Sequence, residues 1–241
     1  MNLELQNMHV SVDGKEVVRG VSLCVPRGSV VALMGPNGSG KSSLVNAILG
    51  HPRYTITEGR VLLCGEDITH IPPHQKAKKG IFLSMQHAPA LPGITVSSFL
   101  RNACSALTGK TLPVLSFQNM LEIEMKKLGI DIEMAGRHVN EGFSGGEKKR
   151  LDALQLVLFK PQFALLDETD AGLDIDALKI VAETIKQASA VMGILLITHY
   201  TRILNYLTPD EVHVLQDGII TRSGGKELAE EIEKQGYKNE R

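Results

Sequence analysis

The sequence predicts an α/β fold, in which antiparallel strands precede a mainly parallel sheet and a helical insertion interrupts it. Three observations lead to this prediction. The apolar runs "SVVALM", "FALLD" and "GILLIT" are continuous, as in strands that are buried on both faces of a sheet. Segments with helical periodicity separate these runs. Between residues 88 and 137, helical periods punctuated by Pro and Gly replace the strand patterns.

Local patterns predict the elements in order. Residues 3–34 read as short strands with turn signals at Asp13-Gly14 and Arg27-Gly28, which indicates an antiparallel start. The helical pattern "KSSLVNAILG" ends at Gly50, and "GRVLLCGEDI" and "GIFLSMQ" return to strands. We then expect a helix from Ser144, a helix in "DALKIVAETIKQASA", a hairpin in "EVHVLQDGII" and a frayed tail in "EIEKQGYKNER".

Composition limits the possible partners. The chain of 241 residues carries a net charge of −1, so no general attraction to nucleic acid or anionic membranes is expected. No apolar run approaches the roughly 20 residues of a membrane span, and we expect no direct membrane insertion. Cys24, Cys64 and Cys104 lack CxxC spacing and follow no signal sequence, which favours reduced, buried thiols and a cytoplasmic location.

A glycine-rich loop lies between the run "SVVALM" and the following helix. "GPNGSGKS" matches the pattern G-x-x-x-x-G-K-[ST], whose backbone amides and helix N-terminus bind phosphates. Lys41 can reach the β- and γ-phosphates of a nucleotide, and the Ser42 hydroxyl can bind Mg²⁺. The alternative is an ordinary strand-to-helix turn that binds no ligand. The predicted nucleotide-binding residues of this loop are Gly35, Pro36, Asn37, Gly38, Ser39, Gly40, Lys41, Ser42 and Ser43.

Polar residues follow three of the predicted strands. "FALLDE" brings Asp167 to the carboxyl edge of the sheet, where it can hold Mg²⁺ and where Glu168 can orient or deprotonate water. A helix N-cap is the alternative role for this acidic pair. His199 follows "GILLIT" and can contact the γ-phosphate, although a lone His is more often structural. Gln86 ends "GIFLSMQ" and can touch Mg²⁺ and water.

"FSGGEKKR" is a second turn of small residues that opens a helix, and Ser144, Gly145 and Gly146 can face an anion there. With it, the chain resembles the ATP-binding cassette (ABC) ATPases, whose signature is typically L-S-G-G-Q. In that family two subunits pair head to tail, and each signature caps the ATP held by the other subunit. Six motifs occur here in the family's order, at residues 35–42, 86, 144–147, 163–168, 171–174 and 199.

The resemblance implies an ATPase that uses ATP and Mg²⁺, with an ABC ATPase fold and a RecA-like core. It implies a single domain with a catalytic core over 1–87 and 151–241 and a helical subdomain over 88–150. Asp174 would contribute across a transient head-to-tail homodimer. Two departures from the family stand out. No aromatic residue precedes the phosphate loop to stack on adenine, leaving Val12, and Thr169-Asp170 replaces the Pro that usually follows the catalytic Glu in transport cassettes.

Two functional classes remain open. "LLDETDAGLDIDALK", "FSGGEKKR" and "APALPGITVSSFL" resemble the ATPase family of the SUF iron–sulfur cluster assembly systems, which implies SufB/SufD-like scaffold proteins as partners. The alternative is the nucleotide-binding subunit of an ABC importer. Thr169-Asp170 and residues 88–100 favour the assembly ATPase. No metal-ligand pattern accompanies the cysteines, so we expect cluster ligands to come from the partner.

Lys148 and Lys149 occupy the first turn of the helix after Ser144, where cations are disfavoured. One hypothesis is that one of them pairs with a nearby carboxylate, such as Glu168, and keeps a free subunit idle. The alternative is a solvated basic face.

Overall fold

A mostly parallel sheet forms the centre of the protein. The computed structural model describes residues 1–86, 88–198 and 202–237. Six strands run in the order β12-β11-β3-β10-β9-β6, and only the β11–β12 pair among them is antiparallel. Their bounds are Val30–Met34 (β3), Ile81–Ser84 (β6), Phe163–Asp167 (β9), Gly193–Ile197 (β10), Glu211–Gln216 (β11) and Ile219–Gly224 (β12). The predicted α/β architecture is confirmed.

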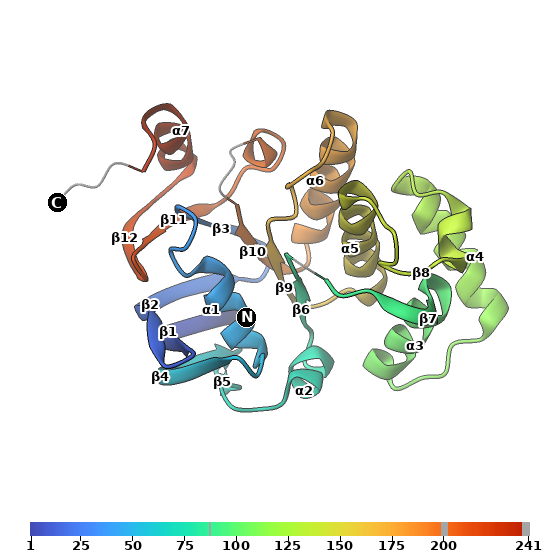
Figure 1. Ribbon diagram of the computed structural model, residues 1–241, viewed down its shortest axis with the longest axis horizontal. Coiled ribbons are helices and arrows are strands. Elements are labelled where there is room, and N and C mark those ends of the chain that lie inside the picture. Colours follow the sequence, from blue (N-terminus) through green and yellow to red (C-terminus); the bar gives the residue numbers. More distant parts are fainter. Residues whose placement is uncertain (87, 199–201, 238–241) are drawn as a thin grey trace.

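A separate antiparallel sheet contains the N-terminal strands, as predicted. Its order is β2-β1-β4-β5 (Figure 1). The strands are Asn2–Val12 (β1), Lys15–Pro26 (β2), Tyr54–Leu63 (β4) and Glu66–Asp67 (β5). The β1–β2 turn is made by Asp13 and Gly14, both with positive φ, which Asp and Gly tolerate better than most residues.

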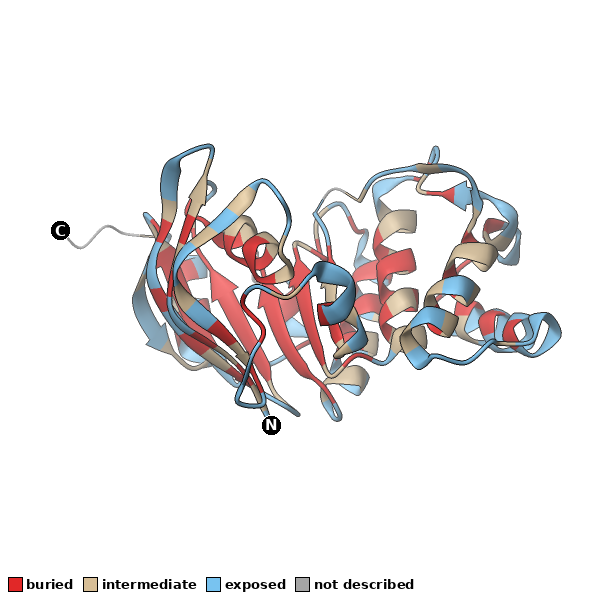
Figure 2. Ribbon diagram, turned by 90° about the horizontal axis from the view of Figure 1, so that it is seen from below, coloured by how far each residue is buried: buried red, intermediate tan, exposed pale blue. Residues whose placement is uncertain are grey.

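The central strands supply two hydrophobic cores because successive side chains point to opposite faces. Along β3, Val31 and Leu33 pack with helix α1 (Lys41–Leu49) and the N-terminal sheet. Val30, Ala32 and Met34 belong to the other core, with helices α5 (Gly145–Phe159) and α6 (Ile175–Ser189). Figure 2 shows the buried central strands between these layers. Burial on both faces explains why these strands are continuous apolar runs.

Residues 88–144 contribute mainly helices, with α3 at Val96–Thr108, α4 at Val114–Lys127 and a 3-10 helix at Ile132–Gly136. A small sheet that the sequence patterns did not predict pairs β7 (Leu91–Thr95) with β8 (His138–Val139). Helix α2 (Pro73–Lys78) precedes β6, and a short 3-10 helix spans Ile203–Asn205. The division into a core and a helical subdomain at residues 88 and 150 stays a prediction.

Two expectations were wrong. The tail was expected to be frayed from residue 231 onward, yet helix α7 (Lys226–Gln235) includes residues 231–235, because Leu228, Ala229 and Ile232 form a buried stripe on it. The last part of that tail, residues 238–241, lies outside the described residues. The cysteines were expected to be buried, but Cys64 is exposed just after β4 and Cys24 is half-buried, so only Cys104 fits that description. Across the described ranges, no helix is both long and apolar enough to span a membrane.

Candidate active site

The carboxyl ends of four adjacent parallel strands bring the predicted catalytic residues to one edge of the sheet. β3, β10, β9 and β6 lie side by side in register, with Leu33 opposite Ile197 and Ile197 opposite Asp167. The phosphate loop leaves β3, Asp167 ends β9, and Gln86 follows β6. Ligands bind at this kind of edge in open α/β sheets. His199 follows β10 in the sequence but lies outside the described residues.

The phosphate loop depends on glycines at two close approaches. A Cβ atom on Gly35 would lie 2.1 Å from the Leu215 carbonyl oxygen, and one on Gly40 would lie 2.7 Å from the Val17 carbonyl oxygen. Both glycines have positive φ, which side chains disfavour. The Ser39 hydroxyl oxygen is buried in the loop without a hydrogen-bond partner among the described residues. The loop therefore offers backbone amides and a spare hydroxyl to an anion.

Lys41 is held inside the loop by its own backbone. Its Nζ donates to the carbonyl oxygens of Gly35 at 2.8 Å and Pro36 at 2.9 Å. Its side chain is buried, and burial lowers its pKa while the carboxylates of Glu168 and Asp167 oppose this shift. The ammonium thus faces the site as a positive charge that phosphate oxygens can neutralise.

Asp167 presents a carboxylate that is almost fully buried, at 1% exposure. Burial raises its pKa, and the neighbouring Ser42 hydroxyl opposes this shift. The Asp167 Oδ1 atom has no hydrogen-bond partner within the described part of the chain. A buried oxygen in this state is costly unless a ligand satisfies it, and hard cations prefer oxygen ligands. Asp167 and Ser42 therefore fit a Mg²⁺ site.

Glu168 has a left-handed backbone conformation with φ of 50°, which is uncommon for residues other than glycine. Its N–H donates to the Ile197 carbonyl at 3.0 Å, and its carboxylate Oε2 accepts from Gln86 Nε2 at 2.6 Å. The structure therefore brings these two predicted residues together. The alternative role of the acidic pair as a helix N-cap is wrong, because Asp174 caps the following helix α6.

The signature residues are bonded within their own turn. The Ser144 hydroxyl accepts from the Glu147 N–H at 3.2 Å, and the Glu147 carboxylate accepts from the Ser144 N–H at 2.7 Å. Arg137 adds an ion pair to Glu147 at 2.6 Å. These contacts lower the pKa of Glu147, with the Ser144 N–H as the main cause. Gly145 and Gly146 form the first turn of α5. This capping box fixes where α5 begins.

The position of Lys149 differs from the hypothesis that one of the two lysines after the signature pairs with Glu168. Lys149 is buried, and its Nζ lies 4.0 Å from the Asp152 carboxylate and 3.4 Å from the Asp167 carbonyl oxygen. Its carboxylate partner is thus Asp152 rather than Glu168, and a solvated basic face does not describe it. The signal was present in the sequence, because Asp152 interrupts the apolar inner face of α5.

The phosphate loop makes one further contact that the sequence did not predict. The Gly35 N–H donates to the Tyr237 hydroxyl at 3.1 Å, so the chain after α7 returns to the phosphate loop. Burial raises the pKa of Tyr237. The surrounding residues are charged and carry no loop motif, so the sequence held no signal for this contact.

Comparison with known proteins identifies the family of this chain. Residues 18–171 match the family described as ABC transporter. A probable ABC transporter ATP-binding protein of Streptococcus pyogenes serotype M3 is 49% identical over 240 residues, covering 98% of this chain and 93% of that protein. Vegetative protein 296 of Bacillus subtilis is 47% identical, covering 98% of this chain and 91% of that protein.

Solved structures extend the likeness to the fold. An ATP-binding cassette in its ADP conformation has a TM-score of 0.76 and 26% identity, covering 98% of this chain and 96% of that chain. A dimeric cassette bound to ADP and phosphate has a TM-score of 0.82 at 20% identity, covering 94% of this chain and 99% of that chain. The predicted ABC ATPase fold is confirmed. The chain therefore belongs to the ABC transporter family, as an ATP-binding subunit that hydrolyses ATP.

Proposed function

We propose that this chain is the ATPase of a cytoplasmic iron–sulfur cluster assembly complex of the SUF type, the role of SufC. The observation that carries this choice is Thr169-Asp170. Both residues are buried, and the Asp170 carboxylate accepts a hydrogen bond from the Thr198 hydroxyl at 3.0 Å. Thr169 and Asp170, which distinguish this chain from transport cassettes, are thus buried at the sheet edge that carries the candidate active site, where β9 and β10 end.

In this proposal the phosphate loop binds ATP. Lys41 exchanges the carbonyls of Gly35 and Pro36 for phosphate oxygens, which form stronger, charge-assisted hydrogen bonds. The loop also presents backbone amides to the phosphates, apart from that of Gly35, which donates to the Tyr237 hydroxyl. The Ser39 hydroxyl, buried without a partner in the described ranges, gains a phosphate oxygen as its partner. Val12 offers adenine an apolar contact in place of aromatic stacking.

Mg²⁺ is held by Ser42, Asp167 and Gln86 in this proposal. The support is the Asp167 Oδ1 atom, which has no hydrogen-bond partner among residues 1–86, 88–198 and 202–237. Bound Mg²⁺ neutralises charge on the β- and γ-phosphate oxygens. Asp167 and Ser42 position that charge at the mouth of the loop.

Glu168 acts as the base that aligns and deprotonates the attacking water, and Gln86 and His199 orient the γ-phosphate side of the site. Two chains close head to tail on ATP, with Ser144, Gly145 and Gly146 capping the partner's nucleotide and Asp174 contributing across the interface. A structurally similar cassette is dimeric, which supports the formation of a dimer. Closure excludes water and so strengthens the electrostatic contacts to the phosphates.

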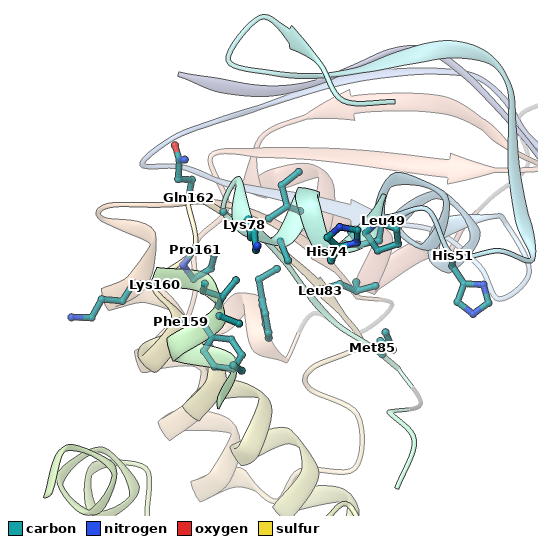
Figure 3. Close-up of a pocket in the computed structure, with 18 of the residues that line it drawn as sticks. Leu49, His51, His74, Lys78, Leu83, Met85, Phe159, Lys160, Pro161 and Gln162 are labelled. Carbon is teal, nitrogen blue, oxygen red and sulfur yellow. The ribbon is translucent and has the colours of Figure 1, made fainter. Parts of the chain in front are cut away.

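The scaffold docks in an apolar groove beside the phosphate-loop helix. A cavity of about 770 Å³ lies between α1, α2, β6, α3 and the end of α5 (Figure 3). Leu83, Met85, Leu107 and Phe159 line it, and it touches Leu49 at the end of α1. His74, Lys78 and Lys160 are also at the cavity, and no Asp or Glu of the described residues lines it. This chemistry fits an apolar helix of a SufB/SufD-like scaffold with acidic flanking residues.

The alternative function is the nucleotide-binding subunit of an importer, and the name of the Streptococcus relative, a probable ABC transporter ATP-binding protein, favours a role in transport. Affinity purification of the tagged chain from its own cells separates the two. We expect a soluble SufB-like protein to copurify, and a polytopic membrane protein in its place would overturn the proposal. Ala106→Glu in the groove should abolish copurification, whereas Ala190→Glu at the end of α6 serves as the matched control.

A further inference from the structure

Three buried polar side chains connect helix α5 with the two strands that end at the catalytic residues. The hydroxyl of Ser84, the last residue of β6, donates to Asp152 Oδ2 on α5 at 2.7 Å. The Lys149 ammonium, one turn earlier on α5, lies 4.0 Å from the same oxygen. It also donates to the backbone carbonyl of Asp167, the last residue of β9, at 3.4 Å. Charged groups on α5 therefore reach both strands.

This network lies next to the proposed hydrolytic pair. Ser84 is separated from Gln86 by one residue, and Asp167 immediately precedes Glu168. Gln86 and Glu168 are themselves hydrogen-bonded at 2.6 Å. Helix α5 itself begins directly after the Ser144 cap of the signature turn. A shift of the signature turn along α5 would therefore move Asp152 and Lys149, and with them the ends of β6 and β9.

The contribution of this network to the stability of the fold does not explain its presence. The side chains of Lys149 and Asp152 are 8% and 12% exposed, so both charges are largely desolvated. Burial raises the pKa of Asp152 to about 6, while Lys149 and the Ser84 hydroxyl oppose this shift. Neighbouring inward residues of α5, such as Leu151 and Leu154, are apolar. A buried ion pair is often no more stabilising than apolar residues of similar volume, but its directional bonds fix a geometry.

We propose that Asp152, together with Lys149 and Ser84, forms a positioning unit that sets Gln86 and Glu168 against the γ-phosphate according to the seating of the signature helix. None of the three touches the nucleotide in this proposal. Asp152 acts on Gln86 through Ser84 and β6, and Lys149 acts on Glu168 through the Asp167 backbone. The inference rests on the proposed roles of Gln86 and Glu168, and adds the residues that align them.

The test compares Asp152→Asn, Ser84→Ala and the double variant in the full-length chain without a scaffold. Asp152→Asn keeps the side-chain shape but removes the charge that faces Lys149, and Ser84→Ala removes only the hydroxyl. We expect each single variant to lower kcat by about tenfold, because small misplacements of catalytic groups are costly. The affinity for a non-hydrolysable ATP analogue should stay within about twofold, since ground-state binding is untouched. The double variant should be no slower than the slower single variant.

The controls separate alignment from general damage. Glu122→Gln removes an exposed carboxylate from α4 and should leave kcat and the melting temperature unchanged. Unaltered kcat in both single variants would overturn the proposal, and so would an equal loss of kcat and analogue affinity. Strictly multiplicative losses in the double variant would also overturn it, because residues of one unit are not additive. The proposed role of Glu168 as the base is tested separately: if Glu168→Gln hydrolyses ATP at the normal rate, that role is wrong.

Discussion

The Gln86 amide donates to the Glu168 carboxylate at 2.6 Å, across the gap between the ends of β6 and β9. Glu168 makes this contact from a left-handed backbone conformation with φ of 50°. Such a conformation costs free energy and persists where surrounding contacts hold it, here including the bond from Glu168 N–H to Ile197. The unusual backbone directs the Glu168 carboxylate along the sheet edge toward Gln86, which is also proposed to act in ATP hydrolysis.

Lys41→Ala should weaken nucleotide binding itself rather than the hydrolytic step. Removing a charged hydrogen-bond donor from the phosphates is expected to raise the dissociation constant for ATP by about tenfold to hundredfold. Titration calorimetry with a non-hydrolysable analogue measures this directly. Lys41 also bonds the carbonyls of Gly35 and Pro36, so the melting temperature must be compared in parallel. A folded variant with normal affinity would show that Lys41 does not contact the phosphates.

Gly35→Ala should destabilise the whole domain, because its new Cβ would lie 2.1 Å from the Leu215 carbonyl oxygen. We expect a loss of about 2 kcal/mol or more in the free energy of unfolding, typical of a strained backbone with a steric clash. Gly38→Ala is the matched control. Gly38 also has positive φ but open space around it, so a loss of only about 1 kcal/mol is expected. Denaturant titration compares the two, and equal losses would contradict the account.

Lys76 makes stability depend on pH in the alkaline range. Its fully buried Nζ donates to the carbonyls of Ile48 and Thr69, and burial lowers its pKa from 10.5 to about 8. Between these two values the unfolded chain binds a proton that the folded chain has lost. The contribution of Lys76 to the free energy of unfolding therefore rises as pH increases from about 8 to 10.5.

Lys76→Met removes this titration. We expect the stability of the wild type, relative to this variant, to increase between pH 7.5 and pH 10, with the steepest change above about pH 8. Urea unfolding of both proteins across that range measures the difference, and subtraction removes the titration of other groups. Parallel curves would mean that the pKa of Lys76 is not lowered.

Much of the candidate active site could be located from the sequence because its residues come directly after strands with a strong local signal. "SVVALM", "FALLD" and "GIFLSMQ" are apolar runs, and parallel strands bring the residues at their carboxyl ends to one sheet edge. The sequence therefore predicts that Gln86 and Glu168 lie at this edge. Their direct hydrogen bond, however, depends on strand order and on the left-handed backbone of Glu168, which no local pattern specifies.

Other features could not be predicted because their stabilising contacts are distant in sequence. Strand β7 contains Pro92 and Gly93, which are depleted in strands, and it exists through pairing with β8. Helix α7 is mostly charged, and only Leu228, Ala229 and Ile232 are buried in it. The bond between Tyr237 and Gly35 joins residues that only the fold brings together.

Asp152 lies between these two cases. A charged residue on the inner face of a helix is visible in the sequence as a break in an apolar pattern. Its contact with Ser84 is not visible, because Ser84 comes from a strand far away in the chain. Its contact with Lys149, by contrast, joins residues one turn apart on the same helix, so local spacing already brings these two side chains near each other.

The most direct test of the central claim is ATP turnover by Glu168→Gln, measured together with the mass of the complex formed in the presence of ATP and Mg²⁺. The variant keeps the size of the side chain and its contact with Gln86 but removes the base. We predict that turnover falls by about a hundredfold or more while a dimer that retains ATP accumulates. Hydrolysis at the wild-type rate would contradict the account, because Glu168 would then not be the base.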